Sequence, residues 1–299
     1  MSEAMKRVAV IGAGTMGNGI AHVFAQSGHT VTLVDVQAAA LERAQATIDR
    51  NLDRLVAKER ISAEDKAATL ARLSTSTEMH GAVADADLVV EAATERLDLK
   101  LKIFEQLDAA APEHCILATN TSSISITKIA AATKRPAQVI GMHFMNPVPI
   151  MKLVEVIRGY DTSDATTATT VALSKQLGKV PVEVNDYPGF VANPILMPLI
   201  NEALCSLHEG VAGVAEIDEV MKLGMAHPMG PLHLADFIGL DVCLSILRVL
   251  HDGFGQPKYA PCPLLVNMVT AGKLGVKSGE GFYVHTKGSK DIQVAPAFS

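Results

Sequence analysis

The 299-residue sequence predicts an α/β fold, in which a mostly parallel sheet is followed by a second, all-helical domain. Three observations predict this fold. Short, continuous apolar runs are typical of strands buried on both faces, and helical periodicity separates these runs. From about residue 188 to about residue 275, only helical periodicity remains. A chain of this length usually forms two domains, and Pro188-Gly189 marks the expected boundary between residues 1–187 and 188–299.

The apolar runs predict strands joined by right-handed crossovers, at residues 8–11, 31–34, 88–90, 115–118, 139–142, 152–157 and 180–184. A charged region from about residue 37 to about residue 73 predicts an inserted helical hairpin. Its second helix starts where Ser62 is followed by Asp65 at the third helical position. In the second domain, helices are expected at residues 195–207, 217–223, 232–250 and 264–269, before a glycine-rich tail at 277–283.

Composition excludes several classes of protein. A net charge of −6 argues against nucleic acid as the main partner, and no apolar run is long enough to span a membrane. Residues 1–7 lead directly into the first strand, which leaves no room for a signal peptide. The four cysteines are far apart and form no CxxC pair. We therefore expect structural thiols in a reducing, cytoplasmic location, and no metal site.

A glycine-rich turn follows the first strand and opens the first helix. Gly12, Gly14 and Gly17 form GxGxxG, with Thr15 and Met16 between the last two glycines. In this strand–turn–helix context, the motif predicts a Rossmann-type dinucleotide site, where the helix N-terminus binds the pyrophosphate.

The cofactor preference depends on the end of the second strand. Asp35 lies there, 18 residues after Gly17, and no arginine stands directly beside it. Its carboxylate can bind both ribose hydroxyls and repels a 2′-phosphate, which favours NAD over NADP. The alternative is that Asp35 caps the next helix and the glycines only shape a turn.

Candidate chemical groups follow two later strands, whose carboxyl ends meet at one edge of an open sheet. Ser122 comes after one strand, and His143 ends the next. Glu155 lies in a run that should be buried, so it needs a partner, and His143, 12 residues earlier, is the nearest candidate. A histidine oriented by an acid is suited to take the proton that hydride transfer leaves behind.

Each of these residues also has a structural interpretation. Glu155 could face solvent on an edge strand, and Ser122 or Ser123 could cap a helix. Asn193, just after the domain boundary, could be an ordinary first-turn residue. Arg50, Arg54 and Lys58 repeat every four residues on one helix face, either as solvated surface or as a site for the phosphates of a bulky acyl carrier.

The chain resembles the short-chain 3-hydroxyacyl-CoA dehydrogenase family, and within it the bacterial enzymes of 3-hydroxybutyryl-CoA. The resemblance runs nearly end to end. Its motifs are Gly12 to Gly17, Glu91-Ala92-Ala93-Thr94-Glu95, Asn120 to Ser123, Gly141 to Pro149, Lys152 to Val156, Pro188 to Asn193, Met221 to Gly224, Pro228 to Pro231 and Lys277 to Tyr283.

The resemblance implies NAD-dependent oxidation of (S)-3-hydroxyacyl-CoA to 3-oxoacyl-CoA, and the reverse reduction, by a homodimer that forms through the helical domain. His143 would be the catalytic base and Glu155 its partner, with Asn146 as a supporting hydrogen-bonding residue. Ser122 and Asn193 would hold the 3-oxygen of the substrate. The further residues implied at the cofactor are Glu95, Lys100, Asn120, Ser122, Asn146 and Lys277, and those at CoA are Asn51, Arg54 and Lys58.

Two positions depart from the family pattern. Pro194 stands where relatives carry Arg, and Met145 where they carry Phe; these changes bear on chain-length preference more than on chemistry. Three other functions stay open on the sequence. They are a dehydrogenase of free β-hydroxy acids that uses a lysine as acid and base, a crystallin-like nucleotide-binding protein without activity, and an enzyme that prefers NADP.

Overall fold

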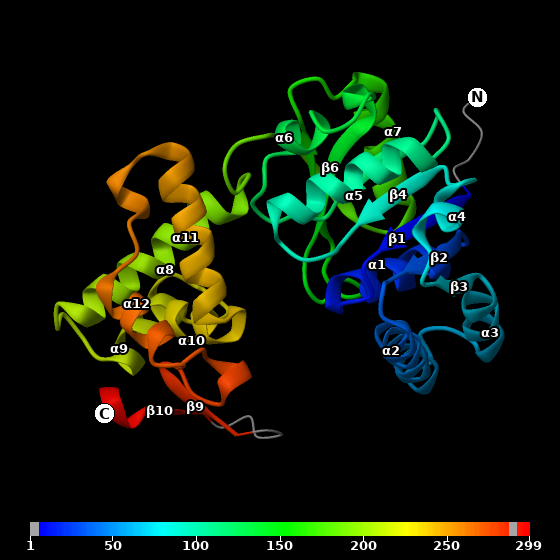
Figure 1. Cartoon of the computed structure of the whole chain (residues 1–299). Helices are drawn as coiled ribbons and strands as arrows, with labels where there is room; N and C mark the ends of the chain where they lie inside the picture. Colours follow the sequence, from blue (N-terminus) through cyan, green and yellow to red (C-terminus); the bar gives the residue numbers. More distant parts are fainter. Residues whose placement is uncertain (1–5, 287–291) are drawn as a thin grey trace. The chain divides into compact units, whose positions relative to one another are not determined.

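The computed structural model describes residues 6–286 and 292–299 of the chain. The chain divides into two compact units, Met1–Tyr187 and Pro188–Ser299, which are described separately below (Figure 1). Residues 1–5, on which the expected absence of a signal peptide depends, lie outside the described residues.

The first unit is built on an eight-stranded sheet in the order β3-β2-β1-β4-β5-β6-β7-β8. All neighbouring strands are parallel except β6 and β7, which are antiparallel. The predicted α/β fold with a mostly parallel sheet is therefore confirmed. The strands are β1 (Arg7–Ile11), β2 (Thr30–Val34), β3 (Leu73–Ser76), β4 (Leu88–Glu91), β5 (Ile116–Thr119), β6 (Val139–Phe144), β7 (Leu153–Arg158) and β8 (Val180–Asn185).

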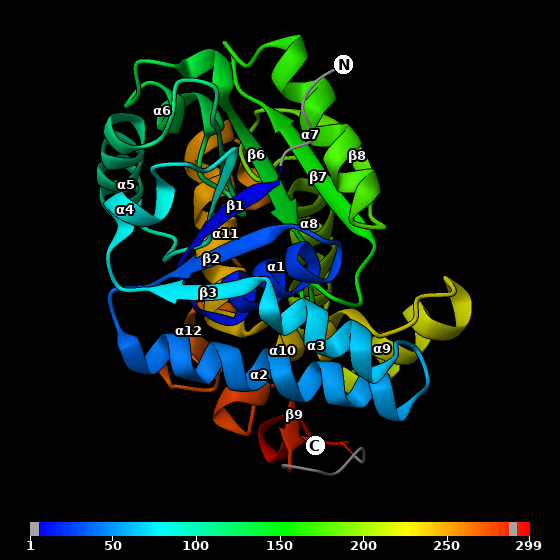
Figure 2. The same ribbon diagram turned by 90° about the vertical axis from the view of Figure 1, so that its right-hand side faces the viewer.

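Helices cover both faces of this sheet, as Figure 2 shows. One core joins α1, α2 and α7 to side chains such as Val10, Leu33 and Met142. On the other face, α5 contacts α4 and α6, and the buried side chains there include Phe104 of α5 and Ile129 of α6. The helical segments are α1 (Thr15–Gln26), α2 (Ala38–Ala57), α3 (Ala63–Ala71), α4 (Met79–Val83), α5 (Leu97–Ala110), α6 (Ile126–Ala130), η1 (Pro136–Gln138) and α7 (Asp164–Gln176).

The hairpin of α2 and α3 occupies the expected region. Ser62 and Asp65 form a reciprocal capping box at the start of α3, as the sequence predicts. The strand β3 that follows was not predicted. Its sequence Leu73-Ser74-Thr75-Ser76 has no apolar run because it forms the edge of the sheet, where only β2 pairs with it.

The second unit is helical, as predicted, and packs around a core of its own that includes Ile200, Leu204 and Leu247. The expected helix at residues 232–250 is two helices, because Gly239 adopts a φ of 103° between them. A short antiparallel pair, β9 and β10, was not predicted. The elements are α8 (Ala192–His208), α9 (Val214–Glu219), η2 (Val220–Gly224), α10 (Pro231–Ile238), α11 (Leu240–Phe254), η3 (Pro257–Tyr259), α12 (Pro263–Thr270), η4 (Val276–Ser278), β9 (Tyr283–His285), β10 (Ile292–Val294) and η5 (Pro296–Phe298).

The described residues hold neither a candidate membrane span nor a candidate metal cluster. No helix among them has the length and the apolar character required to cross a bilayer. Nor does any group of three potential metal-ligating side chains gather in the described part of the chain.

A buried histidine makes the first unit sensitive to acid. His22 on α1 is completely buried, and desolvation lowers its pKa from 6.5 to about 4. Between these two pH values the unfolded chain binds a proton that the folded chain does not. Because the folded-state pKa is depressed, the stability present above pH 6.5 is lost as the pH falls toward 4, by at most about 3 kcal/mol.

We therefore expect His22→Met, which fills the site without a titrating group, to flatten the fall in melting temperature between about pH 6.5 and pH 4.5. Thermal unfolding of wild type and variant across this range measures the effect. Parallel curves for the two proteins would assign the acid sensitivity to other groups.

Candidate active site

The antiparallel pairing of β6 with β7 places His143 directly opposite Glu155. Directly opposite residues of paired strands lie on the same face, so their side chains meet. Nδ1 of His143 lies 2.8 Å from Oε2 of Glu155, and both residues are buried. The interpretation of Glu155 as a solvent-facing residue on an edge strand is therefore wrong.

The other ring nitrogen of His143 faces Ser122, since Nε2 lies 3.1 Å from its Oγ. A carboxylate can only accept, so the ring proton belongs on Nδ1, toward Glu155. The lone pair of the neutral ring is then on Nε2, toward the serine hydroxyl. Glu155, His143 and Ser122 thus form one hydrogen-bonded chain, in which Nε2 of His143 accepts from the Ser122 hydroxyl at the outer end.

Glu95 anchors the loop that carries Ser122. Its Oε1 accepts hydrogen bonds from the hydroxyl of Thr121 at 2.6 Å, from the backbone N–H of Ser122 at 2.9 Å, and from both the N–H and the hydroxyl of Ser123 at 3.1 Å. Because several donors of one loop bond to a single carboxylate oxygen, the loop has little freedom to move. Glu95 therefore fixes where the Ser122 hydroxyl lies.

A second carboxylate anchors the same loop further along. Ser125, rather than Ser122 or Ser123, caps α6 through the N–H of Lys128. Asp186, at the end of the first unit, accepts from the hydroxyl of Ser125 at 2.7 Å and from the N–H groups of Ile126 and Thr127 at 3.0 and 2.8 Å. The chain just before the second unit is thus tied to the loop that carries Ser122.

A side-chain amide joins the residue after β5 to the last residue of β6. Oδ1 of Asn120 accepts the backbone N–H of Phe144 at 2.8 Å, which links the two strand ends beside His143. Asn146 lies exposed in the turn after β6, and Met145 is half-buried between it and the strand. Asn120 therefore has a structural contact here, whereas Asn146 is open to a ligand.

Lys100 belongs to a buried ion pair that the sequence analysis missed. Its Nζ lies 2.8 Å from both carboxylate oxygens of Glu91, which also accepts the hydroxyl of Thr119 at 2.7 Å. Lys100 is 1% exposed and Glu91 is fully buried. Such a pair needs every group satisfied, and here the ends of β4 and β5 supply the partners. A glutamate at the end of an otherwise apolar strand was the available signal.

The glycine-rich loop has the features of a phosphate cradle. A Cβ on Gly17 would stand 1.7 Å from the carbonyl oxygen of Gly12, so the helix and strand could not approach as they do. Gly12 has a φ of 103°, which favours glycine. A Cβ on Gly14 would meet nothing, and no side chain caps α1, whose first N–H groups remain available to an anion. Thr15 and Met16 form the first turn of that helix.

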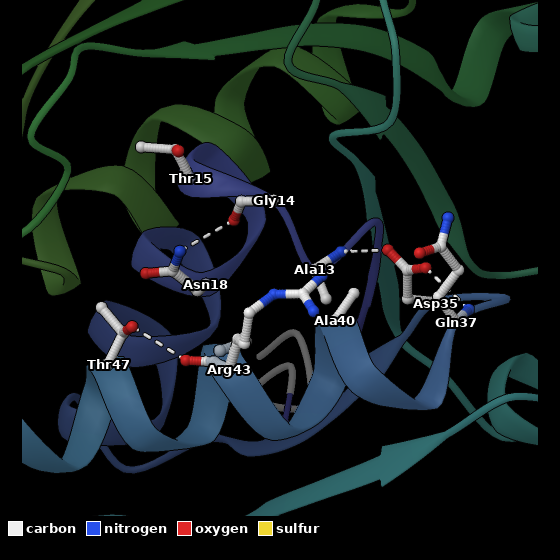
Figure 3. Close-up of a pocket in the computed structure, with 10 residues that line it drawn as sticks. Ala13, Gly14, Thr15, Asn18, Asp35, Gln37, Ala40, Arg43 and Thr47 are labelled. Atoms are coloured by element: carbon white, nitrogen blue, oxygen red, sulfur yellow. Dashed lines mark hydrogen bonds between the residues drawn. The ribbon is translucent and has the colours of Figure 1, made fainter.

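Asp35 closes one side of a cavity of about 380 Å³ beside this loop (Figure 3). One carboxylate oxygen accepts the N–H of Ala13 in the loop at 2.8 Å, and the other accepts the N–H of Gln37 at 2.9 Å. Gln37 precedes α2, so the predicted alternative of a structural role is also present. A carboxylate has further acceptor sites, and Asp35 can keep both contacts while it binds hydroxyl groups.

The basic stripe lies on the outer part of α2. Arg54 and Lys58 are exposed, and Asn51 is half-buried with its Oδ1 3.4 Å from Arg54. No carboxylate of the described chain pairs with Arg54 or Lys58, so both cations remain open to phosphate.

Two predicted residues belong to the second unit and are described within it. Asn193 is the second residue of α8 and is buried, and Pro194 follows in the first turn, where an N–H has no partner to lose. Lys277 in the tail pairs with Asp241 on α11. The glycine-rich tail packs on Asp236, since a Cβ on Gly281 would stand 1.9 Å from that carboxylate.

Comparison with known proteins agrees with this geometry. A family model for the NAD binding domain of 3-hydroxyacyl-CoA dehydrogenase matches residues 7–187, and a model for the C-terminal domain matches residues 189–285. The chain belongs to the 3-hydroxyacyl-CoA dehydrogenase family. Its division into two units coincides with the junction between the two family domains.

Similar members of the family come from bacteria and from mitochondria. The chain is 52% identical to the 3-hydroxybutyryl-CoA dehydrogenase of Bradyrhizobium diazoefficiens, over 98% of this chain and 99% of that protein. It is 47% identical to the mitochondrial hydroxyacyl-coenzyme A dehydrogenase of Rattus norvegicus, over 93% and 91%. The crystal structure of (S)-3-hydroxybutyryl-CoA dehydrogenase from Ralstonia eutropha superposes with a TM-score of 0.92 at 54% identity, over 95% of this chain and all of that one.

The contact between Asp186 and α6 can be tested by substitution. In Asp186→Ala, the N–H groups of Ile126 and Thr127 lose their acceptor, so we expect the free energy of unfolding to fall by about 2 kcal/mol and these two amides to exchange faster. Urea unfolding and hydrogen exchange measure both. Asp161→Ala removes an exposed carboxylate of the same unit as a control. Unchanged exchange at residues 126 and 127 would contradict the anchoring role.

Proposed function

We propose that this protein catalyses the NAD-dependent interconversion of (S)-3-hydroxyacyl-CoA and 3-oxoacyl-CoA, with the short-chain 3-hydroxybutyryl-CoA as its substrate. Family membership and the names of the similar enzymes support the reaction class. The observation that carries the proposal is the chain from Glu155 through His143 to Ser122, in the unit that holds the glycine-rich cradle.

His143 is proposed as the acid and base of this reaction. In oxidation, Nε2 of His143 takes the proton of the substrate hydroxyl, and in reduction it returns that proton to the 3-oxo oxygen. Glu155 holds the ring with its proton on Nδ1 and stabilises the imidazolium that forms. Ser122 hydrogen-bonds the reacting oxygen, and Asn193 of the second unit is proposed to share this role. Bound NAD supplies the acceptor for the hydride that leaves C3.

The remaining residues of the proposed site bind the two larger ligands. The cradle residues Gly12, Gly14, Thr15, Met16 and Gly17 would hold the pyrophosphate of NAD, and Asp35 its ribose hydroxyls. The other residues proposed at the cofactor are Glu95, Lys100, Asn120, Ser122, Asn146 and Lys277. In this proposal Lys100 contributes its charge from a buried position, because its Nζ is already bonded to Glu91.

The CoA phosphates are assigned to α2. The exposed cations Arg54 and Lys58 and the adjacent Asn51 lie along one face of this helix. Unpaired cations on a rigid helix can bind phosphate without first breaking an ion pair. A free 3-hydroxy acid offers no phosphate to this face, so turnover of acyl-CoA but not of the free acid is expected.

His143→Gln is the decisive test of the reaction. Glutamine keeps polarity and approximate size but cannot take up a proton, so kcat with acetoacetyl-CoA and NADH should fall by a factor of about 10²–10⁴. The dissociation constant for NADH, measured by fluorescence titration, should remain within about twofold of wild type. His80→Gln, at an exposed position on α4, serves as the matched control.

Several outcomes would contradict the proposal. A His143→Gln variant that keeps kcat within tenfold of wild type would remove His143 from the chemistry. Activity of the wild type on free 3-hydroxybutyrate alone would point to a β-hydroxyacid dehydrogenase, and NADH binding without turnover to a nucleotide-binding protein that lacks catalysis.

We further propose that the protein is a cytoplasmic homodimer that assembles through the helical unit. All four cysteines are free, which suits a reducing compartment. The helical unit exposes large apolar side chains on η2 and α10, where Leu223 is 82% exposed, Val220 61% and Phe237 60%. Apolar side chains of this size on neighbouring elements are typical of protein–protein contacts.

Leu223→Glu should shift the protein toward the monomer, because a carboxylate would have to be desolvated at the contact. Sedimentation velocity of wild type and variant at micromolar concentration measures the change. Tyr160→Glu, at an equally exposed apolar position of the first unit, should leave the dimer intact. A dimer that survives Leu223→Glu would place the contact elsewhere.

A further inference from the structure

The cavity beside the glycine-rich loop contains a cation that the sequence analysis did not connect with it. The cavity lies between the loop, the end of β2 and the first turns of α2, and Arg43 of α2 lines it together with Asn18 and Asp35. In Figure 3, the Arg43 side chain extends from α2 toward the loop, and its guanidinium ends near Ala13. The cavity volume of about 380 Å³ falls in the range of small-molecule sites.

The guanidinium of Arg43 is held by no side chain of the described chain. Four other arginines of the first unit, Arg7, Arg96, Arg135 and Arg158, have carboxylate partners, whereas Arg50, Arg54, Arg60 and Arg72 pair with none among the described residues. Arg158, for example, lies between Asp164 at 2.5 Å and Glu183 at 3.2 Å, and Arg135 pairs with Asp108 at 2.7 Å. Among the described residues, no carboxylate comes within ion-pair distance of Arg43. Its charge is therefore available to whatever enters the cavity.

Asp35 contributes the opposite charge to the same cavity. Its carboxylate is held in place by the backbone N–H groups of Ala13 and Gln37 rather than by a cation. No cation neutralises this carboxylate, so it repels a phosphate and can accept hydroxyl groups in the cavity. The cavity thus combines a carboxylate held in place by hydrogen bonds with a guanidinium that has no ion-pair partner among the described residues.

We propose that Arg43 is a further cofactor-binding residue and, with Asp35, determines the choice between NAD and NADP. The guanidinium covers the adenosine end of NAD, because its plane can stack on an aromatic ring while it remains partly hydrated. It also supplies the cation that a 2′-phosphate requires. Asp35 repels the 2′-phosphate of NADP while Arg43 attracts it, so the balance of the two charges sets the preference. The inference rests on the proposed placement of the cofactor, but not on the acyl-CoA reaction.

Single substitutions of Arg43 and Asp35 should change the affinities for NADH and NADPH. Arg43→Leu should weaken NADH binding about two- to fivefold, the effect expected from loss of a partly exposed cation–π contact. Asp35→Ala should tighten NADPH binding by about tenfold or more, because the repulsion is removed while Arg43 remains. Asp35→Asn keeps one acceptor for the loop and should show the same direction of change if Asp35→Ala is poorly folded.

The double variant separates this proposal from a simpler one. If Asp35 acted only by repulsion, Asp35→Ala/Arg43→Leu would bind NADPH as well as Asp35→Ala does. We expect instead that the double variant loses most of the tenfold gain. Arg60→Leu, which removes an exposed arginine beyond the end of α2, controls for the change in net charge.

The measurement is a fluorescence titration of each variant with NADH and with NADPH, with melting temperatures as a check on folding. This readout needs no acyl-CoA, so it remains valid if the proposed reaction is wrong. Loss of the NADPH gain in the double variant, but not when Arg60→Leu replaces Arg43→Leu, supports the proposal. Equal NADPH affinity of the single and double variants, or no gain in Asp35→Ala and Asp35→Asn, would overturn it.

Discussion

The antiparallel register between β6 and β7 is the constraint on which the candidate site depends. A shift of one residue along β7 would turn Glu155 to the other face of the sheet and leave His143 opposite an apolar side chain. The buried carboxylate would then lack its partner, at a cost of several kcal/mol. His143 and Glu155 are polar residues within otherwise apolar strands. Their pairing therefore helps to specify the strand register that places them together.

Around this pair, carboxylates accept hydrogen bonds from loop and backbone donors and so hold the loops in place. Glu95 collects donors of the loop after β5, and Asp186 collects those at the start of α6. The loop that carries Ser122 is thus fixed on both sides by acceptors from distant segments. Since a misplacement of about 1 Å can reduce catalysis strongly, these contacts position the hydroxyl that His143 faces.

Features that depend on local sequence patterns could be predicted from the sequence. Apolar runs located the strands, and the pairing of Glu155 with His143 followed from the need of a buried charge for a partner. Contacts across long stretches of sequence could not be predicted in this way. Asp186 is about 60 residues from α6, and Glu95 is 26 to 28 residues from the loop that it anchors. Arg43 is not next to Asp35 along the chain, and only the turn of the helix brings it to the same cavity.

The three glycines of the nucleotide motif are glycine for different physical reasons. Gly12 and Gly17 are required by the protein itself, since one has a positive φ and the other packs against the loop at a distance that no side chain permits. A turn of purely structural purpose would need both. Gly14 is different, because a Cβ there would enter open space and its φ is ordinary for any residue. Nothing within the fold explains a glycine at this position, whereas a ligand that approaches the start of α1 would. Of the three, Gly14 therefore carries the evidence that the loop binds a cofactor.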